Sequence, residues 1–260
     1  MLMKSAQVTN ALTMKLEQFT CFSAADRERL DQLSSDNLHT WPAKCDVLEE
    51  GKHVETIHLV VSGLAMRNKI MPDGKRQIMA FLIPGDLCDV EVFVLGEMDH
   101  AISAVSDTTC ARIPSSTMTG LLTEMQGLTR ALWWSTMTDA AVLRERIIDF
   151  GQRKAPERMA HLFYEMLVRY RMIGLAKDNS YLFPVTQEEL ADATGLTPVH
   201  VGRTLRKLRS AGLIEFSGKI LTVKDAPALK RMARFSADYL HLRQTNEDVG
   251  GVSQRVGDLV

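Results

Sequence analysis

The sequence of 260 residues lacks the signals that mark membrane and exported proteins. It has no run of about 18 apolar residues, so we expect no transmembrane helix and no membrane partner. Its N-terminus is amphipathic and has no compact apolar stretch before a small-residue cleavage site, so we expect no signal peptide. The cytoplasm is therefore the expected location.

Cysteine is scarce, and the few cysteines are scattered along the chain. No C-x-x-C pair occurs, which argues against a structural zinc site and against a disulfide framework. We expect no metal site, and we expect reduced, mostly buried thiols at Cys21, Cys45, Cys88 and Cys110.

The signatures of common catalytic sites are also missing. The sequence shows no Ser, His and Asp in the order of a hydrolase triad, no glycine-rich phosphate loop and no His pair at metal-ligand spacing. We therefore predict no catalytic residues and no resident cofactor. A small-molecule enzyme is the remote alternative.

What the sequence does contain is an uneven distribution of charge, hidden by a net charge of −1. Residues 153–234 hold 15 Lys and Arg against 8 Asp and Glu, whereas residues 1–152 hold 14 against 20. A basic block that follows an acidic one predicts that only the C-terminal part of the chain contacts nucleic acid.

Short apolar runs broken by glycine-bearing turns fill roughly residues 20–115. IHLVVSGLAMRNKI and RQIMAFLI are strand-like, and the PDGK between them is a strong turn signal. AISAVSDTTCARIP is a second expected strand pair, which turns near Ser106 and Asp107. This spacing predicts a small antiparallel barrel or sandwich, preceded by two short helices, the second capped by Ser23.

A long helix is predicted after the barrel, over residues 121–151. Ser135, Thr138 and Ala141 are small enough to let another helix approach closely. A lone helix between two domains must bury its apolar face, and we favour the same helix of a second copy as its partner. The alternative is that it packs only on its own barrel. Its apolar residues are Leu128, Leu132, Trp134, Ala141, Val142, Ile147 and Ile148.

Two short helices joined by a glycine turn are predicted in the basic block. Thr186 and Glu189 form a capping box before the helix QEELADAT, and Gly195 supplies the sharp turn that follows. Thr197 is a second N-cap, and the second helix runs over about residues 198–210. LIEFSGKILTV then predicts a β-hairpin. Helix, turn, helix and hairpin in this order form a winged helix-turn-helix.

The outward face of the second helix carries the residues that we expect to contact double-stranded DNA. Arg203 can make a bidentate pair with O6 and N7 of guanine, and His200 can donate to a neighbouring base. The basic residues after them are expected to neutralise phosphate. The alternative is a solvated basic surface helix, which the caps, the turn and the hairpin disfavour. The full predicted set is Thr197, Val199, His200, Gly202, Arg203, Thr204, Arg206, Lys207 and Arg209.

Together these segments resemble the Crp–Fnr family of bacterial transcription regulators. IHLVVSGLAMRNKIMPDGKRQIMAFLIPGDL is similar to the family's barrel signature, and TQEELADATGLTPVHVGRTLRKLRSAGLI is similar to its DNA-reading motif. The resemblance covers roughly residues 18–235. It implies an α+β fold with an N-terminal antiparallel β-barrel of jelly-roll or cupin type, a long dimerisation helix and a C-terminal winged helix-turn-helix.

The expected domains follow the same order. Residues 1–120 hold the N-terminal helices and a sensor-like barrel, 121–151 the dimerisation helix, 152–235 the DNA-binding domain and 236–260 a flexible tail. The resemblance implies a homodimer on a near-palindromic operator, with its recognition helices about 34 Å apart in consecutive major grooves. RNA polymerase is a further expected partner.

Two departures from the family pattern affect specificity and sensing. Val199 stands where the best-known members carry an acidic residue, so the half-site should differ from theirs, whereas Arg203 matches the family's guanine-reading arginine. The cyclic-nucleotide branch needs a Gly-Glu pair and an arginine for its ligand. Here Asp86 takes the glutamate position and His100 the arginine position, which disfavours cyclic AMP.

Other effectors are open alternatives. Cys21 stands alone where the iron–sulfur branch has a cysteine cluster, and Cys110 lies about one residue from the barrel position, which disfavours a cluster. A different nucleotide in the barrel, a redox-sensing thiol at Cys21, Cys45 or Cys88, and regulation without any small ligand are also open. Haem is a further alternative, with candidate axial ligands His39, His53, His58, His100 and Cys88.

Overall fold

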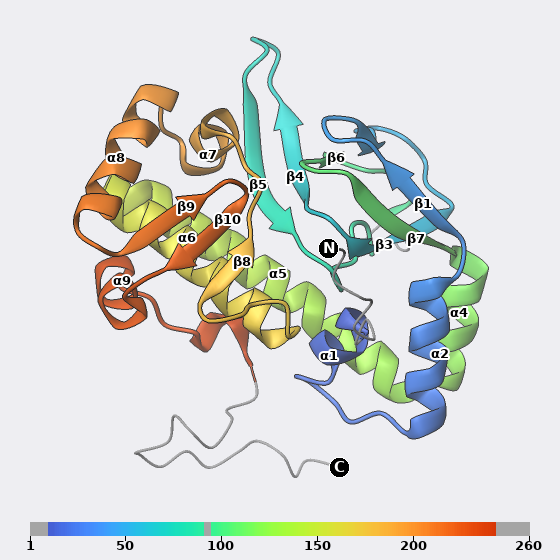
Figure 1. Ribbon diagram of the computed structural model, residues 1–260. Coiled ribbons are helices and arrows are strands. Elements are labelled where there is room, and N and C mark those ends of the chain that lie inside the picture. The colour runs from blue at the N-terminus through green and yellow to red at the C-terminus, as the bar shows by residue number, and fades with distance from the viewer. Residues whose placement is uncertain (1–9, 91–94, 243–260) are drawn as a thin grey trace, which may run out of the picture.

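The computed structural model describes residues 10–90 and 95–242. Figure 1 shows N-terminal helices and a strand-rich domain, the long helix α5, and a C-terminal domain packed beside the strands. This is the α+β architecture that the sequence predicts. The N-terminal elements are α1 (Ala11–Leu16), α2 (Ala24–Ser35), β1 (Leu38–Trp41), β2 (Asp46–Leu48), β3 (Thr56–Ser62), β4 (Ala65–Ile70), β5 (Arg76–Leu82), β6 (Ala101–Ala104) and β7 (Thr108–Pro114).

The seven strands form two antiparallel sheets, in the orders β1-β7-β3 and β2-β6-β4-β5. Side chains from both sheets, among them Val60, Ile102 and Cys110, share one buried apolar cluster. The PDGK turn closes the β4–β5 hairpin, in which Ile70 pairs with Arg76, so this turn prediction is confirmed. Two sheets around a common core form the jelly-roll-like barrel that was expected.

Both strands expected in AISAVSDTTCARIP are confirmed, with the bend between them near Ser106 and Asp107, but their expected pairing with each other is wrong. β6 and β7 follow each other in the chain, but β6 pairs with β2 and β4, whereas β7 pairs with β1 and β3. The chain crosses between the sheets here and again at Gly63, whose φ is +91°. A Cβ on Gly63 would lie 2.4 Å from the carbonyl oxygen of Asp107, so the two corners pack directly on each other. Local alternation predicts strands, and it does not show which sheet each strand joins.

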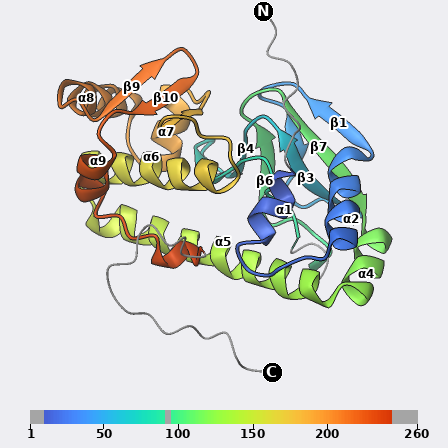
Figure 2. The same cartoon turned by 60° about the horizontal axis from the view of Figure 1, so that its bottom comes forward.

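The long helix begins later than predicted. α4 spans Ser115–Glu124, and α5 spans Gln126–Gln152. Met125 between them has φ of −114° and ψ of 85°, which interrupts the helix. Residues 121–124 therefore belong to α4 and not to the helix expected over 121–151. Figure 2 shows α5 running beneath both the barrel and the C-terminal domain. Neither α5 nor any other described helix is long and apolar enough to cross a membrane.

α5 has one buried face and one exposed face. Ser135 and Ala141, which were expected to let a partner helix approach, are buried against the rest of the same chain. Leu128, Leu132 and Val142 of the predicted stripe are buried there as well. The opposite face is exposed and mostly apolar, although Arg144 also lies on it. Its large apolar side chains are Trp133, Trp134, Met137, Leu143, Ile147, Ile148 and Phe150.

The C-terminal domain contains the predicted winged helix-turn-helix and three elements that were not predicted. β8 adds a third strand to the hairpin, in the sheet order β8-β10-β9, while α9 and a 3₁₀ helix follow the hairpin. The elements are α6 (Ala155–Met172), β8 (Ser180–Leu182), α7 (Gln187–Thr194), α8 (Pro198–Ser210), β9 (Ile214–Ser217), β10 (Ile220–Val223), α9 (Ala226–Ala233) and the 3₁₀ helix η1 (Asp238–Leu240).

The flexible tail expected over 236–260 does not begin at residue 236. Leu240 is buried, and the hydroxyl of Tyr239 donates to Glu165 Oε2 at 2.8 Å. Residues 236–242 therefore pack against α5 and α6. The segment is polar overall, but its few apolar and aromatic side chains are buried or partly buried against these helices. The rest of the expected tail, 243–260, lies outside the described residues.

The barrel and the C-terminal domain share a continuous apolar core along β5. The ring of Phe81 packs edge-on against the ring of Phe183, with centroids 5.3 Å apart. Polar contacts continue the interface, because Arg76 Nε donates to a carboxylate oxygen of Asp192 at 2.9 Å and Gln77 Nε2 donates to its carbonyl at 2.7 Å. The position of the C-terminal domain is therefore set partly by the barrel.

Candidate nucleic-acid interface

Two caps and a tight turn present the second helix of the helix-turn-helix. The Glu189 N–H donates to Thr186 Oγ1 at 3.1 Å, and the Thr186 N–H donates to Glu189 Oε2 at 2.7 Å, which confirms the predicted capping box. Gly195 ends α7 with φ of +63°. The His200 N–H donates to Thr197 Oγ1 at 3.3 Å, so α8 begins at its predicted cap.

The inner face of α8 packs into the domain through Val201, Leu205 and Leu208, which are buried. Gly202 lies where α8 passes the start of α7, and a Cβ at this position would lie 3.1 Å from Gln187 Oε1. A larger residue would require the Gln187 side chain to shift by a few tenths of an ångström, so Gly202 leaves room for Gln187 where the two helices cross.

Thr204 differs from the other predicted contact residues. It is only 4% exposed, and its hydroxyl donates to the backbone carbonyl of His200 at 2.9 Å. Thr204 therefore lies on the inner side of α8. We assign it to holding the first turns of the helix, not to contacting DNA.

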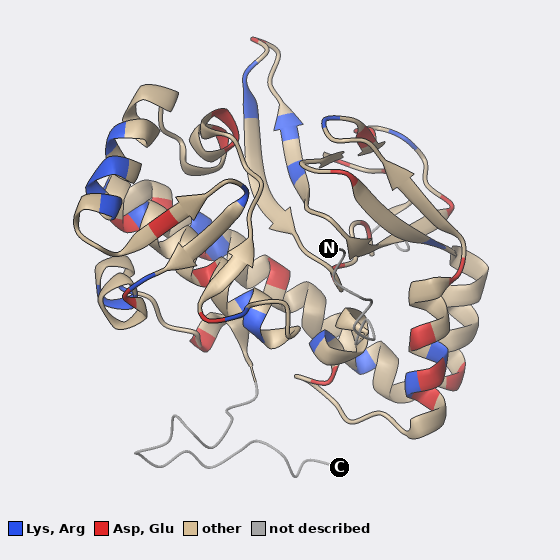
Figure 3. Ribbon diagram, viewed as in Figure 1, with Lys and Arg blue, Asp and Glu red and all other residues tan. Residues whose placement is uncertain are grey.

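The outer face of α8 is exposed, basic and partly apolar. Val199 is 65% exposed at its start, while Arg209 lies farther along with its guanidinium over the ring of Phe216 at 5.8 Å. Figure 3 shows Lys and Arg gathered along α8 at the outer edge of the domain. A capped helix with a cationic outer face fits the width and charge of a DNA major groove. The exposed residues of the predicted set are Thr197, Val199, His200, Arg203, Arg206, Lys207 and Arg209.

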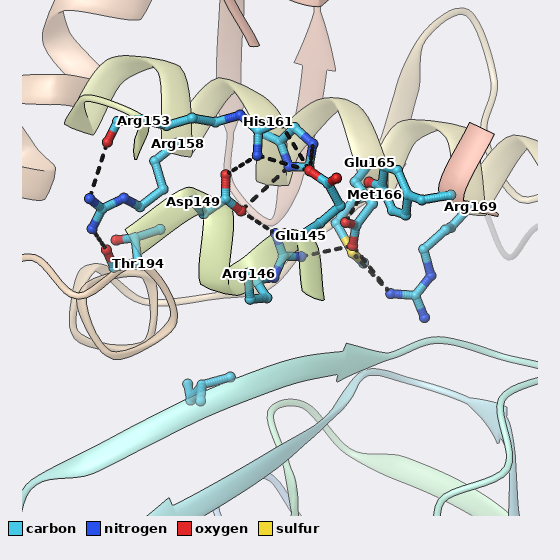
Figure 4. Close-up of polar contacts among 12 residues, drawn as sticks. Glu145, Arg146, Asp149, Arg153, Arg158, His161, Glu165, Met166, Arg169 and Thr194 are labelled. Atoms are coloured by element: carbon cyan, nitrogen blue, oxygen red, sulfur yellow. Dashed lines mark hydrogen bonds and ion pairs between the residues drawn. The ribbon is translucent and has the colours of Figure 1, made fainter. Parts of the chain in front are cut away.

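Buried charged side chains hold the C-terminal domain to α5 (Figure 4). Arg146 of α5 donates to Asp149 Oδ2 at 3.0 Å and to Glu165 Oε1 of α6 at 2.7 Å. Tyr239 of η1 donates to the other oxygen of Glu165. The side chains of Arg146, Asp149 and Glu165 are at most 10% exposed. Because a buried charge without a partner is costly, each of these groups depends on the others.

The local electrostatics shift the pKa values of Asp149 and Tyr239 in opposite directions. Burial alone would raise the pKa of Asp149, but His161 and Arg146 beside it hold that pKa below its ordinary value. Burial, together with Glu165, raises the pKa of Tyr239, so its hydroxyl remains a hydrogen-bond donor. At this junction, therefore, the Asp149 carboxylate stays ionised and the Tyr239 phenol stays neutral.

Asp86, which the sequence resemblance assigned to the glutamate position of the nucleotide cassette, is bound by cations of its own chain. Its Oδ1 accepts from Lys15 Nζ at 2.8 Å, and its Oδ2 accepts from Arg169 at 2.6 Å and from the Ile83 N–H at 2.8 Å. Burial opposes ionisation, but Lys15 and Arg169 hold the pKa of Asp86 below its ordinary value. One carboxylate therefore joins α1, the barrel and α6.

The histidines proposed as haem ligands lie in different surroundings. His39 and His53 are exposed on the barrel surface. His58 is buried with its Nδ1 2.8 Å from Asp89 Oδ2. His100, at the arginine position of the cassette, lies 2.5 Å from Asp99 Oδ1 through its Nδ1. In residues 10–90 and 95–242, no group of three or more His, Cys, Asp or Glu is arranged to hold a metal ion.

The four cysteines divide into two exposed and two buried residues. Cys21 and Cys45 are exposed, whereas Cys88 and Cys110 lie in the barrel core. The neighbouring Cys110 thiol, together with burial, raises the pKa of Cys88 well above its ordinary value. A thiol that stays protonated is a poor nucleophile, so this setting disfavours Cys88 as the redox-sensing thiol.

The sequence interpretation missed the residues that hold the DNA-contacting domain in place. Lys15 and Asp86 are 71 positions apart and Arg169 and Asp86 are 83 apart, so no local pattern connects them. Arg146 and Asp149 gave a weak signal, because they are charged residues three positions apart on a predicted helix. Only the fold shows that their side of α5 faces inward.

Two protein-family models match this chain. The Crp-like helix-turn-helix domain matches residues 157–232, and the cyclic nucleotide-binding domain matches residues 38–125. The first range contains α7, α8 and the wing, and the second contains the seven barrel strands.

Curated relatives are similar over most of their own length. The nitrogen fixation regulation protein FixK of Azorhizobium caulinodans is 28% identical over 189 residues, which cover 72% of this chain and 75% of the relative. The fumarate and nitrate reduction regulatory protein of Salmonella typhi is 21% identical over 187 residues, which cover 72% of this chain and 74% of the relative.

Solved structures share the fold. FixK2 from Bradyrhizobium japonicum superimposes with a TM-score of 0.69 at 25% identity and covers 77% of this chain and 98% of its own. A CRP-family transcriptional regulator from Thermus thermophilus superimposes with a TM-score of 0.59 at 20% identity, covering 76% and 97%.

The Asp86 contacts generate a prediction for stability. Asp86→Asn leaves Lys15 and Arg169 buried without their carboxylate, so we expect the free energy of unfolding at pH 7 to fall by about 3–5 kcal/mol. Urea denaturation measures this loss. The matched control is Asp73→Asn at the exposed tip of the β4–β5 hairpin, which should change stability far less.

The same substitution has a pH signature. The pKa of Asp86 is lower in the folded chain than its ordinary value of 3.8, so its stabilising contribution is complete above that value and is lost as the pH falls below it. Between pH 5 and the acid range, the parent protein should therefore lose stability more steeply than Asp86→Asn. Parallel stability curves for the two proteins would contradict this assignment.

Proposed function

Because the chain belongs to the Crp–Fnr family of DNA-binding transcription regulators, we propose that it works as a homodimer on a near-palindromic operator. Each protomer would place α8 in one of two consecutive major grooves, about 34 Å apart. The observation that carries the proposal is the two-sided character of α8, which is apolar inside and basic outside between a side-chain cap and a glycine stop.

The outer face of α5 supports the dimer. Trp133, Met137 and Ile147 are 69%, 56% and 72% exposed, and their spacing places them along one side of the helix. Exposed apolar side chains gathered in this way mark an interaction surface. A second copy of α5 would cover them. The sequence left open whether this helix packs on a second copy or only on its own barrel. In this proposal it does both, because its inner face packs on its own barrel and its outer face packs on the second copy.

The exposed residues of α8 divide by position into two roles. Val199, His200 and Arg203 lie in the first turns and would face base edges, with Arg203 opposite a guanine and Val199 near a thymine methyl. Lys207 and Arg209, in the last turn, would meet phosphate oxygens. Specificity would thus come from the start of α8 and general affinity from its end.

Regulation without a cyclic nucleotide is the form that the Asp86 contacts favour. The cavity that Lys15, Asp86 and Arg169 line has a volume of about 30 Å³, which is the share of one water molecule in the liquid. Asp86 is already bound by two cations and one N–H, so it is not available to a nucleotide hydroxyl. We propose that the barrel acts as a scaffold whose contacts position the reading domain.

The remaining assignments follow from this role. The protein would act in the cytoplasm, as a regulator and not as an enzyme, and RNA polymerase would be the partner on which its DNA complex acts. The proposed domains are the barrel with its N-terminal helices and α4, which ends at Glu124, the dimer helix α5 (Gln126–Gln152), and the DNA-binding domain from α6 onward, with residues 236–242 packed against it.

The base-reading role of α8 is tested with Arg203→Ala. On duplexes that the parent protein selects from a random pool, we expect Arg203→Ala to lose about 1–3 kcal/mol of binding free energy and to relax base preference at one position per half-site. Lys207→Ala, the control on the same helix, should weaken specific and random DNA alike and reduce the salt dependence. Equal losses on both DNAs for Arg203→Ala would exclude base reading.

The dimer is tested with Ile147→Glu, which places a carboxylate at the most exposed apolar position of the outer face of α5. We expect this variant to be monomeric in analytical ultracentrifugation at concentrations where the parent protein is dimeric, because taking a carboxylate out of water on association costs more than burying the isoleucine. Ile70→Glu on the hairpin tip, where the parent side chain is 62% exposed, is the matched control and should stay dimeric. A parent protein that sediments as a monomer at all concentrations would refute the dimer.

A further inference from the structure

Arg158, near the start of α6, lies where three parts of the chain meet (Figure 4). Its Nη1 donates to the backbone carbonyl of Thr194 at 2.5 Å. Its Nη2 donates to the carbonyl of Arg153 at 3.1 Å and to that of Phe150 at 3.4 Å. A single planar group therefore contacts α5, the connection between α5 and α6, and the end of α7.

Each of these carbonyls would otherwise lack a helical partner. Phe150 lies in the last turn of α5, and Thr194 is the last residue of α7, where carbonyl oxygens have no N–H farther along the helix to accept from. The carbonyl ends of helices carry partial negative charge, so a cation is favourable at this place. Arg158 satisfies two helix ends and the connection between α5 and α6 at once.

The contact also reaches the turn that begins the reading helix. The guanidinium of Arg158 lies over the ring of Phe150 at 5.3 Å. Both groups lie close to Gly195. A Cβ at this position would lie 3.2 Å from a ring carbon of Phe150 and 3.4 Å from Arg158 Nη1. Gly195 has a positive φ and stands two residues before the cap of α8. Little freedom therefore remains between the end of α5 and the start of α8.

We infer that Arg158 is the positioning residue that fixes the direction of α8 relative to α5, and hence the half-site spacing that the dimer accepts. The inference rests on the homodimer proposed above, in which α5 lies at the two-fold axis and α8 reads the DNA. A small rotation at the junction would move the distant ends of both α8 helices in opposite directions. Without Arg158, the dimer would then bind DNA with altered spacing between the half-sites as well as it binds DNA with the selected spacing.

The chemistry of arginine makes the inference specific. Its fork donates from two nitrogens in fixed directions, whereas a lysine carries the same charge on one nitrogen. Arg158→Lys keeps the cation beside the helix ends, but it cannot serve the Thr194 and Arg153 carbonyls together. A role in charge alone would be rescued by lysine, and a bridging role would not.

The experiment measures binding to DNA of varied spacing. The probes are duplexes that carry the site selected by the parent protein from a random pool, the same site with its centre lengthened or shortened by about one or two base pairs, and a single half-site. The proteins are the parent, Arg158→Ala, Arg158→Lys and Phe150→Ala. The control is Arg171→Ala, an exposed arginine of the same helix that bonds Asn179 within its own domain.

We expect Arg158→Ala to bind the selected site about tenfold more weakly, the scale of a lost charged hydrogen bond, while its binding to the half-site stays unchanged. Its preference for the selected spacing over the altered ones should shrink by a similar factor. Arg158→Lys should behave like Arg158→Ala, and Phe150→Ala should show a smaller effect in the same direction. Arg171→Ala should keep the parent's preference.

Two results would overturn the inference. The first is an Arg158→Ala protein that keeps the full spacing preference, and the second is one that loses half-site and full-site binding equally, which indicates general damage to the domain. Phe150→Ala answers the question if Arg158→Ala does not fold, and sedimentation must show that this variant is as dimeric as the parent, because Phe150 also belongs to the exposed face of α5. A parent protein with no spacing preference at all would count against the proposed dimeric function, so the two failures are distinguishable.

Discussion

The structure depends on the pairing of charges buried at the junction between α5 and α6. Arg146 lies between Asp149 and Glu165, and Glu165 also receives the Tyr239 hydroxyl from the end of the chain. A buried charge must be matched where it lies, so these side chains allow one arrangement of α5, α6 and η1. Arg169, one turn beyond Glu165, extends the chain of charges to Asp86 and thus to the barrel and α1. The reading domain is held by charges as well as by apolar packing.

This arrangement leaves two helices with one face used inside the chain and one face turned outward. α5 packs its inner face on the barrel and α6, and it exposes an apolar outer face. α8 packs an apolar inner face and exposes a basic outer face. The two outward faces differ in chemistry, and each fits the partner proposed for it, a second copy of the chain for α5 and DNA for α8. Arg158 contacts the end of α5 and the end of α7, which precedes α8, and we propose that it helps to set the distance between the two outward faces.

The features that the sequence predicted are those that local chemistry determines. The caps at Thr186 and Thr197 and the left-handed turn at Gly195 depend on neighbours within a few positions, and the structure confirms each of them. The sheet assignment of β6 and β7 depends on corners that touch across the barrel, and the expected pairing was wrong. The Asp86 contacts join residues more than 70 positions apart, which periodicity and capping signals cannot report. Thr204 shows the same limit. The sequence placed it among the DNA-contacting residues, but the packing of α8 places it on the buried side of the helix.

The most direct test of the central claim is a methylation-protection footprint of the parent protein on a duplex that it selects from a random pool. Dimethyl sulfate reacts at guanine N7 in the major groove, which is the atom that Arg203 is proposed to cover. The account predicts two protected guanine patches on one face of the duplex, about 10 base pairs apart and related by two-fold symmetry. A single protected patch, or protection without symmetry, would contradict it.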